Sequence, residues 1–214
     1  MLSYPMNDQP YAIPAASVRY DEEIKKSLFM TFLQHTPGIE SAKAFIEQIK
    51  NHYPDARHHC WAFVAGRPDN SMKWGFSDDG EPSGTAGKPI LAQLSGAQVG
   101  EITAVVVRYY GGVKLGTGGL VKAYGGGVQQ ALKQLQTIEK KITKTLNLAL
   151  DYGLIPLAQS VIQQFGAQEL AAQYLQRVVI TIEIEIRYIE AFTQVITNKS
   201  SARVLVSSDD ELNN

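Results

Sequence analysis

The stretch that most constrains the fold of this chain is the segment at residues 100–127, GEITAVVVRYYGGVKLGTGGLVKAYGGG. Its residues 102–107 are continuously apolar and mostly β-branched, which is typical of a strand buried on both faces. Arg108 ends the apolar run, a glycine-rich turn follows, and residues 120–135 have the spacing of a helix. The glycines at 125–127 weaken that helix locally. The sequence therefore predicts a strand, a glycine-rich turn and a helix in succession.

This succession invites comparison with phosphate-binding loops, because glycines let backbone N–H groups approach an anion at a helix N-terminus. The P-loop spacing G-x-x-x-x-G-K-[ST] does not occur. The glycines between residues 111 and 119 also fail to give G-x-G-x-x-G with an acidic residue about twenty positions further on. A tight structural turn is therefore favoured over either known kind of nucleotide loop.

Composition describes an ordinary globular protein with one large domain or two of average size. The 214 residues carry 20 basic and 21 acidic side chains, so binding of nucleic acid would need a local basic patch. The single cysteine, Cys60, cannot form an intrachain disulfide, which favours a reducing compartment. Residues 1–16 lack the features of a signal peptide, and no apolar run approaches the length of a membrane span. We expect a cytoplasmic protein with no membrane partner.

Around the central segment, the pattern predicts an alternating β/α domain at residues 1–136. The charged residues 21–23 are expected to form the turn between the first two strands, and residues 1–10 a frayed tail. Hydrophobic periodicity and Gly or Pro breaks place the other elements. The predicted strands are 11–20, 24–35, 59–66 and 72–76, and the predicted helices are 39–52 and 89–98.

Beyond Gln136 the pattern changes, which predicts a second domain at residues 137–214. The element order β-α-β-β-α-β is typical of a ferredoxin-like sandwich, so the fold class is α+β. The strand at 177–186 carries Glu183 and Glu185 on one face, and an acidic face disfavours the phosphates of nucleic acid. The predicted elements are strand 138–150, helix 155–165, strands 171–174 and 177–186, helix 189–198, strand 203–206 and a solvated tail at 207–214.

Four segments together resemble the IMPACT family, and in particular its bacterial YigZ-like branch. They are DDGEPSGTAGKP at 78–89, VVVRYYGGVKLGTGGLVKAY at 105–124, ARHHCWAFVAG at 56–66 and DYGLIPLAQ at 151–159. The resemblance implies a first domain similar to the superfold shared by a small-subunit ribosomal protein, GHMP kinases and the fourth domain of elongation factor G. It implies a second domain similar to the ferredoxin-like fifth domain of that factor. The glycine- and serine-rich ATP loop of the kinases has no counterpart here.

Eukaryotic members of that family regulate translation under amino-acid stress, by engaging a ribosome-associated activator of an initiation-factor kinase. They carry an additional RWD domain that has no counterpart in this sequence, so that partner is not carried over. The resemblance still implies a translation-associated regulator that binds RNA, the ribosome or a translation regulator. The expected contact surface combines cations and aromatic rings around flexible glycines, namely Arg108, Tyr109, Tyr110, Gly111, Gly112, Lys114 and Lys122.

A rival hypothesis is an enzyme or anion-binding protein that uses a cleft between the loop at 78–88 and the turn at 111–119. Its expected lining includes Asp78, Asp79, Glu81, Thr85, Lys88 and Arg108. The three carboxylates could also attract a hard cation, although they could equally hold turns and pair with nearby lysines or arginines. No catalytic motif and no cofactor are predicted, and oligomeric state is not readable from the sequence.

His58 and Cys60 alternate with His59 along a predicted strand, so only the first two could share one face. Two ligands do not make a metal site, and no metal is predicted. Core packing of Cys60 is favoured over a nucleophile, because no activating base is readable nearby. Arg108 has two interpretations that remain open, namely a ligand contact and a salt bridge to the acidic loop.

Overall fold

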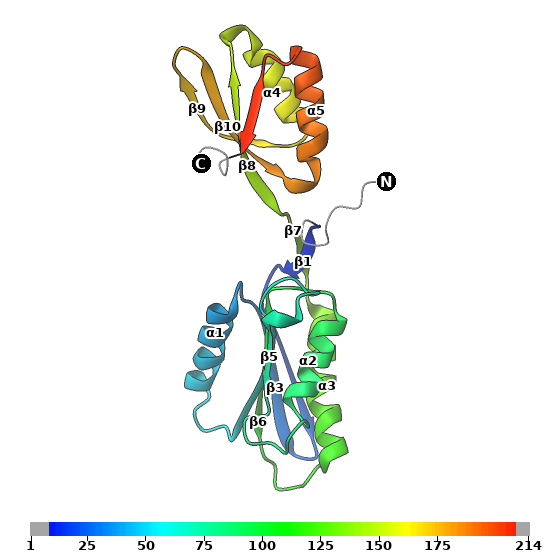
Figure 1. The fold of residues 1–214 in the computed structure, drawn as a ribbon. Helices are drawn as coiled ribbons and strands as arrows, with labels where there is room; N and C mark the ends of the chain where they lie inside the picture. Colours follow the sequence, from blue (N-terminus) through cyan, green and yellow to red (C-terminus); the bar gives the residue numbers. More distant parts are fainter. Residues whose placement is uncertain (1–8, 209–214) are drawn as a thin grey trace. The chain divides into compact units, whose positions relative to one another are not determined.

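The protein is a mixed α/β protein of two domains. A computed structural model describes residues 9–208, and Figure 1 shows its ribbon. The described chain divides into a first unit at residues 11–140 and a second unit with residues 141–208, to which Gln9 and Pro10 are assigned. The boundary therefore lies between Lys140 and Lys141. Of the tails expected at 1–10 and 207–214, residues 1–8 and 209–214 lie outside the described residues.

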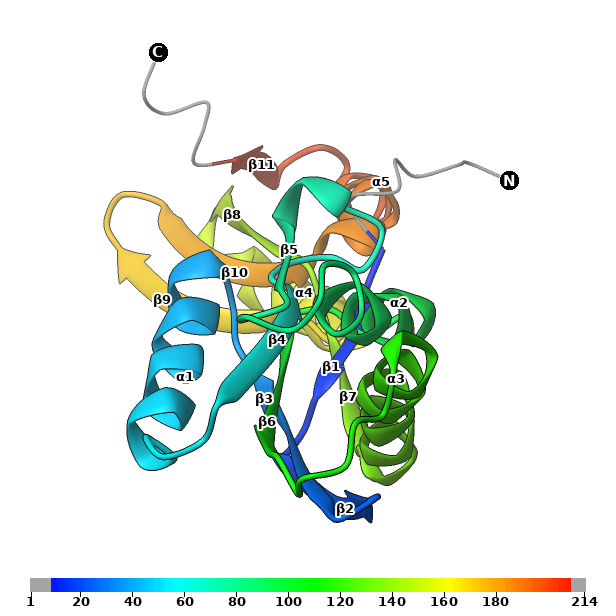
Figure 2. The ribbon, with the colours of Figure 1, turned by 90° about the horizontal axis from the view of Figure 1, so that it is seen from below.

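The first unit is built on a five-stranded antiparallel sheet in the order β2-β3-β6-β4-β5. Helices cover both faces, with α1 on one side of the sheet and α2 and α3 on the other (Figures 1 and 2). A 3-10 turn, η2 (Ser71–Lys73), precedes β5. The elements are β2 (Val18–Ile24), β3 (Ser27–His35), α1 (Ile39–His52), β4 (His58–Val64), β5 (Trp74–Ser77), α2 (Gly87–Gly96), β6 (Ile102–Tyr109) and α3 (Thr117–Gln134).

Strand β6 lies at the centre of this sheet, because its apolar run offers no face that water would solvate. Ala104 and Val106 belong to the core under α2 and α3, whereas Val105 and Val107 belong to the core under α1. The expected burial on both faces is therefore observed. Both neighbours of β6 run antiparallel to it, so the rule that ligands bind at the carboxyl ends of parallel strands does not apply here. Arg108 lies within the strand rather than after it.

The first hairpin turns later than the sequence predicts. Residues 21–23 belong to β2, and the turn is formed by Lys25 and Lys26, whose φ angles are 48° and 66°. Strand β2 lies at the edge of the sheet, where Asp21 and Glu23 point to solvent at alternate positions. An edge strand tolerates charge on its open face, so a run of acids was a poor signal for a turn.

Two short strands join the ends of the first unit. Strand β1 (Tyr11–Pro14) pairs antiparallel with β7 (Thr137–Lys140), with Tyr11 opposite Lys140. The predicted strand at 138–150 is thus two strands that belong to different units. Glu101 links this pair to the sheet, since its buried carboxylate accepts hydrogen bonds from Tyr11 Oη at 2.9 Å and from Lys140 Nζ, and meets His35 Nε2 at 2.9 Å.

The second unit is a four-stranded antiparallel sheet in the order β11-β8-β10-β9, with α4 and α5 packed on one face. Alternate apolar residues of β8 and β10 form its core with Phe192 and Ile196 of α5. Ser207 and Ser208 pair with β8 instead of forming part of a tail. The elements are β8 (Thr143–Leu150), η3 (Tyr152–Leu154), α4 (Ile155–Gln164), β9 (Gln168–Tyr174), β10 (Val178–Glu185), η4 (Ile186–Tyr188), α5 (Ile189–Ser200) and β11 (Leu205–Ser208).

Helices of the described chain pack as parts of these two folded units. Within residues 9–208, none combines the length and the apolar character needed to cross a membrane.

Candidate functional site

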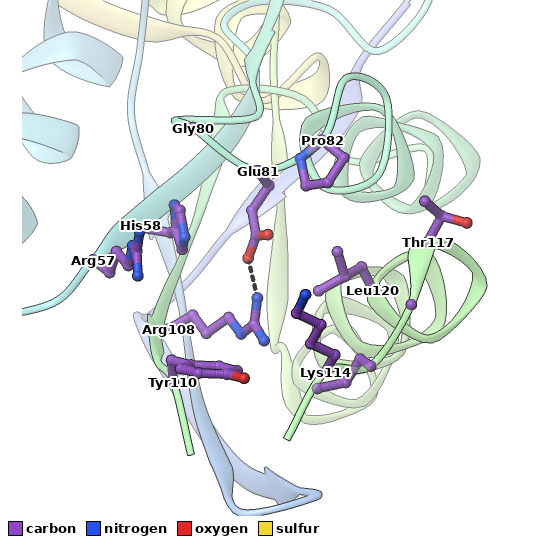
Figure 3. A pocket seen from close by; sticks show the side chains of 12 residues that line it. Arg57, His58, Gly80, Glu81, Pro82, Arg108, Tyr110, Lys114, Thr117 and Leu120 are labelled. Atoms are coloured by element: carbon purple, nitrogen blue, oxygen red, sulfur yellow. Dashed lines mark hydrogen bonds and ion pairs between the residues drawn. The ribbon is translucent and has the colours of Figure 1, made fainter. Parts of the chain in front are cut away.

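A pocket of about 430 Å³ opens in the first unit, on the sheet face that carries α3 (Figure 3). Its wall is formed by the start of β4, the loop before α2, the end of β6 and the N-terminus of α3. Strand pairing explains part of this gathering, because His58 of β4 lies directly opposite Arg108 of β6. The polar side chains of the wall are Arg57, His58, Glu81, Arg108, Tyr110, Lys114 and Thr117.

Arg108 and Glu81 form a buried ion pair at the base of this pocket. The guanidinium Nη1 donates to Glu81 Oε1 at 2.6 Å, and the two side chains are only 7% and 4% exposed. Tyr124 of α3 donates to the same oxygen at 2.7 Å. The guanidinium also lies 5.4 Å from the ring of Phe29 and 5.5 Å from that of Tyr110. These contacts fix the orientation of Arg108.

One donor of Arg108 is left without a partner in the part of the chain that the structure describes. Its Nε atom is buried and has no hydrogen-bond partner among the described residues. The side chain lines the pocket, and Figure 3 shows the Lys114 side chain reaching toward the same space as the guanidinium. An arginine carries five N–H donors in a fixed fork, and Glu81 engages only Nη1.

The carboxylate of Asp78 holds the start of α2. Its Oδ1 accepts from the backbone N–H groups of Ala86 at 2.9 Å and Gly87 at 2.8 Å, and Oδ2 accepts from Gly84 at 2.8 Å. Burial alone would raise the pKa of Asp78, but these three hydrogen bonds, helped by the charge of Lys88, hold it below its usual range. Asp78 therefore acts as a structural cap and does not line the pocket.

Asp79 and Thr85 also serve the loop itself. Asp79 Oδ2 accepts from the backbone N–H of His59 at 2.7 Å, while its carbonyl oxygen accepts from His58 Nδ1 at 2.8 Å. The Thr85 hydroxyl donates to the carbonyl of Pro82 at 2.6 Å. The acidic side chains thus point to separate backbone partners. Among the described residues, no three His, Cys, Asp or Glu side chains are grouped so that they could hold a metal ion.

The glycine-rich turn at residues 110–116 is anchored at its start and open at its end. A Cβ on Gly111 would lie 1.8 Å from the carbonyl oxygen of Lys26, so only glycine permits this approach. The Gly111 N–H donates to Ser27 Oγ at 3.1 Å. At the other end, Gly116 has a φ of 76° and precedes α3, whose first turn has no side-chain cap. The N–H groups of that turn are left for solvent or a ligand.

Cys60 lies behind this site and is fully buried. Its thiol donates to the carbonyl of Asp78 at 2.9 Å, and burial raises the pKa of Cys60 well above its usual range. Burial likewise raises the pKa of Tyr124, the hydroxyl that Glu81 accepts from. A thiol held protonated in a core is a poor nucleophile, so Cys60 has a packing role.

The structure brings only some of the expected binding residues together. Glu81, Arg108, Tyr110 and Lys114 line the pocket. Arg57 and His58 are further lining residues that were not in the expected set, since nothing in the sequence shows which strand lies beside β6. The other expected residues lie outside the lining, namely Asp78, Asp79, Thr85, Lys88, Tyr109, Gly111, Gly112 and Lys122.

Three of the expected residues outside the lining, Tyr109, Lys88 and Lys122, lie elsewhere in the first unit. Tyr109 alternates to the opposite face of the sheet and packs with the core under α1. Lys88 is exposed near Asp78, and Lys122 is exposed on α3. The two lysines of the expected surface, Lys114 and Lys122, therefore differ, because only the first reaches the pocket.

Comparison with known proteins agrees with the two-domain description. Residues 25–132 match the model described as "Impact N-terminal domain", and residues 148–203 match a "Domain of unknown function (DUF1949)". A protein from Haemophilus influenzae named "IMPACT family member" is 52% identical, over 92% of this chain and 95% of its own length. "IMPACT family member YigZ" from Escherichia coli is 49% identical, over 95% of this chain and 100% of its own length.

More distant and structural relatives extend this result. "IMPACT family member YvyE" from Bacillus subtilis is 34% identical over 84% of this chain and 82% of its own length. A solved structure titled "Crystal structure of an hypothetical protein" shares 49% identity and a TM-score of 0.68, and the match covers 93% of this chain and 97% of that one.

Proposed function

Because this chain belongs to the IMPACT family, we propose that it is a cytoplasmic, translation-associated regulator that binds RNA, alone or on the ribosome. The observation that supports this function is the arrangement of the pocket rim. Arg57, Tyr110 and Lys114 are exposed around a cavity whose base holds Arg108. These groups make a local basic surface on a chain whose net charge is only −1.

The chemistry of the rim suits a single-stranded nucleic acid. Neutralisation of phosphates by Lys and Arg supplies most of the non-specific affinity for RNA, and an exposed aromatic ring adds stacking on a base. Tyr110 is 45% exposed, and its ring already lies 5.5 Å from the Arg108 guanidinium. A base stacked on the outer face of Tyr110 would place its phosphate near the cations of the rim.

The sheet of the second unit is less suited to RNA than the pocket rim of the first unit. We include in the proposal a ferredoxin-like fold for this unit, supported by its element order β-α-β-β-α-β and its sheet order β11-β8-β10-β9. The elongation-factor-like superfold of the first unit is part of the same proposal. Glu183 and Glu185 lie on the sheet face opposite the core, where Glu185 pairs with Lys141 and Arg187 at 2.7 Å each. An acidic face is a poor platform for phosphates, so the RNA contact is assigned to the first unit.

Salt-dependent RNA binding tests this function. Binding of the full chain to a single-stranded oligonucleotide should weaken steeply with salt, and the slope should fall by about 0.7 for each phosphate that a variant no longer neutralises. The double variant Arg57→Gln and Lys114→Gln should lower both the affinity and this slope. A matched double variant, Lys43→Gln and Lys133→Gln, removes two exposed cations away from the pocket and should change little. Equal binding by the two double variants, or no RNA and ribosome binding at low salt, would contradict the proposal.

A further inference from the structure

We propose that the pocket is a binding site for a terminal phosphate group, that is, a phosphate monoester carried by a nucleotide. This goes beyond the proposed function, because the same chemistry is offered by a free mononucleotide and by the phosphorylated end of an RNA chain. The pocket, rather than its rim, is the ligand site in this inference.

The first argument is the unused part of the Arg108 fork. Arg108 is 6% exposed, and its Nε is buried with no partner among the described residues. A buried donor left unsatisfied is unfavourable, because it loses its hydrogen bond to water without gaining another. Glu81 binds only Nη1 and so orients the guanidinium without occupying its other donors. The Arg108 side chain lines the pocket, and arginine pairs with phosphate through two parallel N–H donors, so an anion in the pocket would have this guanidinium as a partner.

The second argument is that donors reach the cavity from several directions. Figure 3 shows Arg57 and His58 on one side of Arg108, with Lys114 and the start of α3 on the other. Gly116 and Thr117 contribute the uncapped N-terminus of an 18-residue helix to the lining. Helix N-termini favour anions, and the charges of Arg57 and Lys114 at the same cavity add to that preference.

The third argument separates a terminal phosphate from one inside a chain. A phosphodiester must enter and leave its site, whereas this pocket has a base of buried residues, with Glu81 at 9%, Arg108 at 6% and Leu120 at 6% exposure. A phosphate monoester also carries about −1.5 to −2 charges at neutral pH. Glu81 compensates Arg108, so the charges of Arg57 and Lys114 remain to balance such a dianion.

The size of the cavity allows more than an inorganic ion. About 430 Å³ lies within the range of small-molecule sites, so the sugar attached to the phosphate can also enter. Tyr110 stands at the edge with its ring 45% exposed, where it can contact the sugar or base. A mononucleotide unit therefore matches the pocket in charge and in size.

Calorimetric titration of the full-length protein tests this site with AMP and with adenosine as the probe that lacks phosphate. AMP should bind, adenosine should bind at least tenfold more weakly, and inorganic phosphate should compete with AMP. Lys114→Gln should reduce AMP affinity about tenfold or more, because the lysine would no longer donate a charge-assisted hydrogen bond. Lys122→Gln is the matched control, since this lysine is exposed on α3 outside the lining and should leave AMP affinity unchanged. Both substitutions change exposed side chains and should leave folding intact.

The terminal phosphate could belong to a free mononucleotide or to the end of an RNA chain. Oligonucleotides of one sequence, with a 5′-phosphate, a 3′-phosphate or hydroxyls at both ends, distinguish these two ligands. Tighter binding of a phosphorylated oligonucleotide, abolished by Lys114→Gln, supports the end of an RNA chain as ligand. Binding of AMP without any RNA binding supports a free nucleotide and contradicts the proposed function instead. The inference is overturned if AMP and adenosine bind alike or not at all and the terminal phosphates have no effect, even where RNA itself binds.

Discussion

Arg108 illustrates how a charged residue at the end of a buried strand can have two interpretations in a sequence. The sequence places it at the end of a buried strand and leaves two interpretations open. Its partner Glu81 lies 27 residues upstream, and the two meet because the loop before α2 folds over the end of β6. The salt-bridge interpretation is therefore correct for Nη1. The ligand-contact interpretation concerns the other donors and stays a prediction.

Removal of one partner of this pair should be costly. Glu81→Ala leaves a buried guanidinium without its carboxylate and removes the acceptor of Tyr124, so we expect a loss of about 3–5 kcal/mol in the free energy of unfolding. Urea denaturation of the wild type and of Glu81→Ala measures this difference in the free energy of unfolding. Glu47→Ala on the exposed side of α1 is the control and should change stability by about 0.5 kcal/mol or less. A loss below about 1 kcal/mol for Glu81→Ala would show that water reaches the pair.

Asp78 should make the first unit sensitive to acid. Its pKa is depressed in the folded protein, so its contribution to stability is present above the unfolded value of about 3.9 and is lost as the pH falls through the folded pKa. Asp78→Ala should cost about 1–2 kcal/mol at pH 7, in the range of lost helix caps. The difference between wild type and variant should shrink in urea denaturation at pH 2. Asp55→Ala, an exposed acid, should show no such pattern.

At the scale of elements, the sequence was most informative where burial has a clear period. The helix predicted at 39–52 has the bounds observed for α1, because its apolar face alternates cleanly with Lys and Glu. The strand at 102–107 was also found, and α3 runs through its three glycines. Periodicity does not reveal which strands are neighbours. The antiparallel pairing of β4 with β6, and with it the place of Arg57 and His58 in the pocket, could not be predicted.

The glycines inside α3 should differ sharply in what they tolerate. A Cβ on Gly126 would meet nothing within 4 Å, whereas a Cβ on Gly127 would lie 2.7 Å from Thr31 Oγ1 of β3. Gly126→Ala should therefore stabilise the protein by about 0.5–1 kcal/mol, through the better helix propensity of alanine. Gly127→Ala should destabilise it, because α3 could no longer approach the sheet. Thermal unfolding of the two variants side by side is the measurement, and shifts of the same sign would contradict this assignment.

At the scale of the whole molecule, the two units have separate cores. The sequence placed the change of pattern near Gln136, and the structure places the boundary after Lys140. The four residues between belong to β7, whose partner is β1 rather than β8. A short strand that pairs with the far end of its own domain carries no local signal for that pairing, so a strand running on into the second unit was the simpler interpretation.

A core substitution should therefore act within one unit. Phe192 is fully buried and lies 5.7 Å from the ring of Phe165, so Phe192→Ala should cost the second unit about 3–5 kcal/mol. Hydrogen exchange measured on peptides should show faster exchange in β10 and unchanged exchange in β6. Equal acceleration in both strands would mean that the units unfold as one.

The pairing of β1 with β7 also has a consequence for biosynthesis. Strand β1 is among the first parts of the domain to be synthesised, yet its partner at residues 137–140 is the last. Chains are made from the N-terminus at about 5–20 residues per second, so the hydrogen-bonding edge of β1 stays unpaired for several seconds. Completion of the first domain therefore has to wait until residue 140 has left the exit tunnel, by which time synthesis of the second domain has already begun.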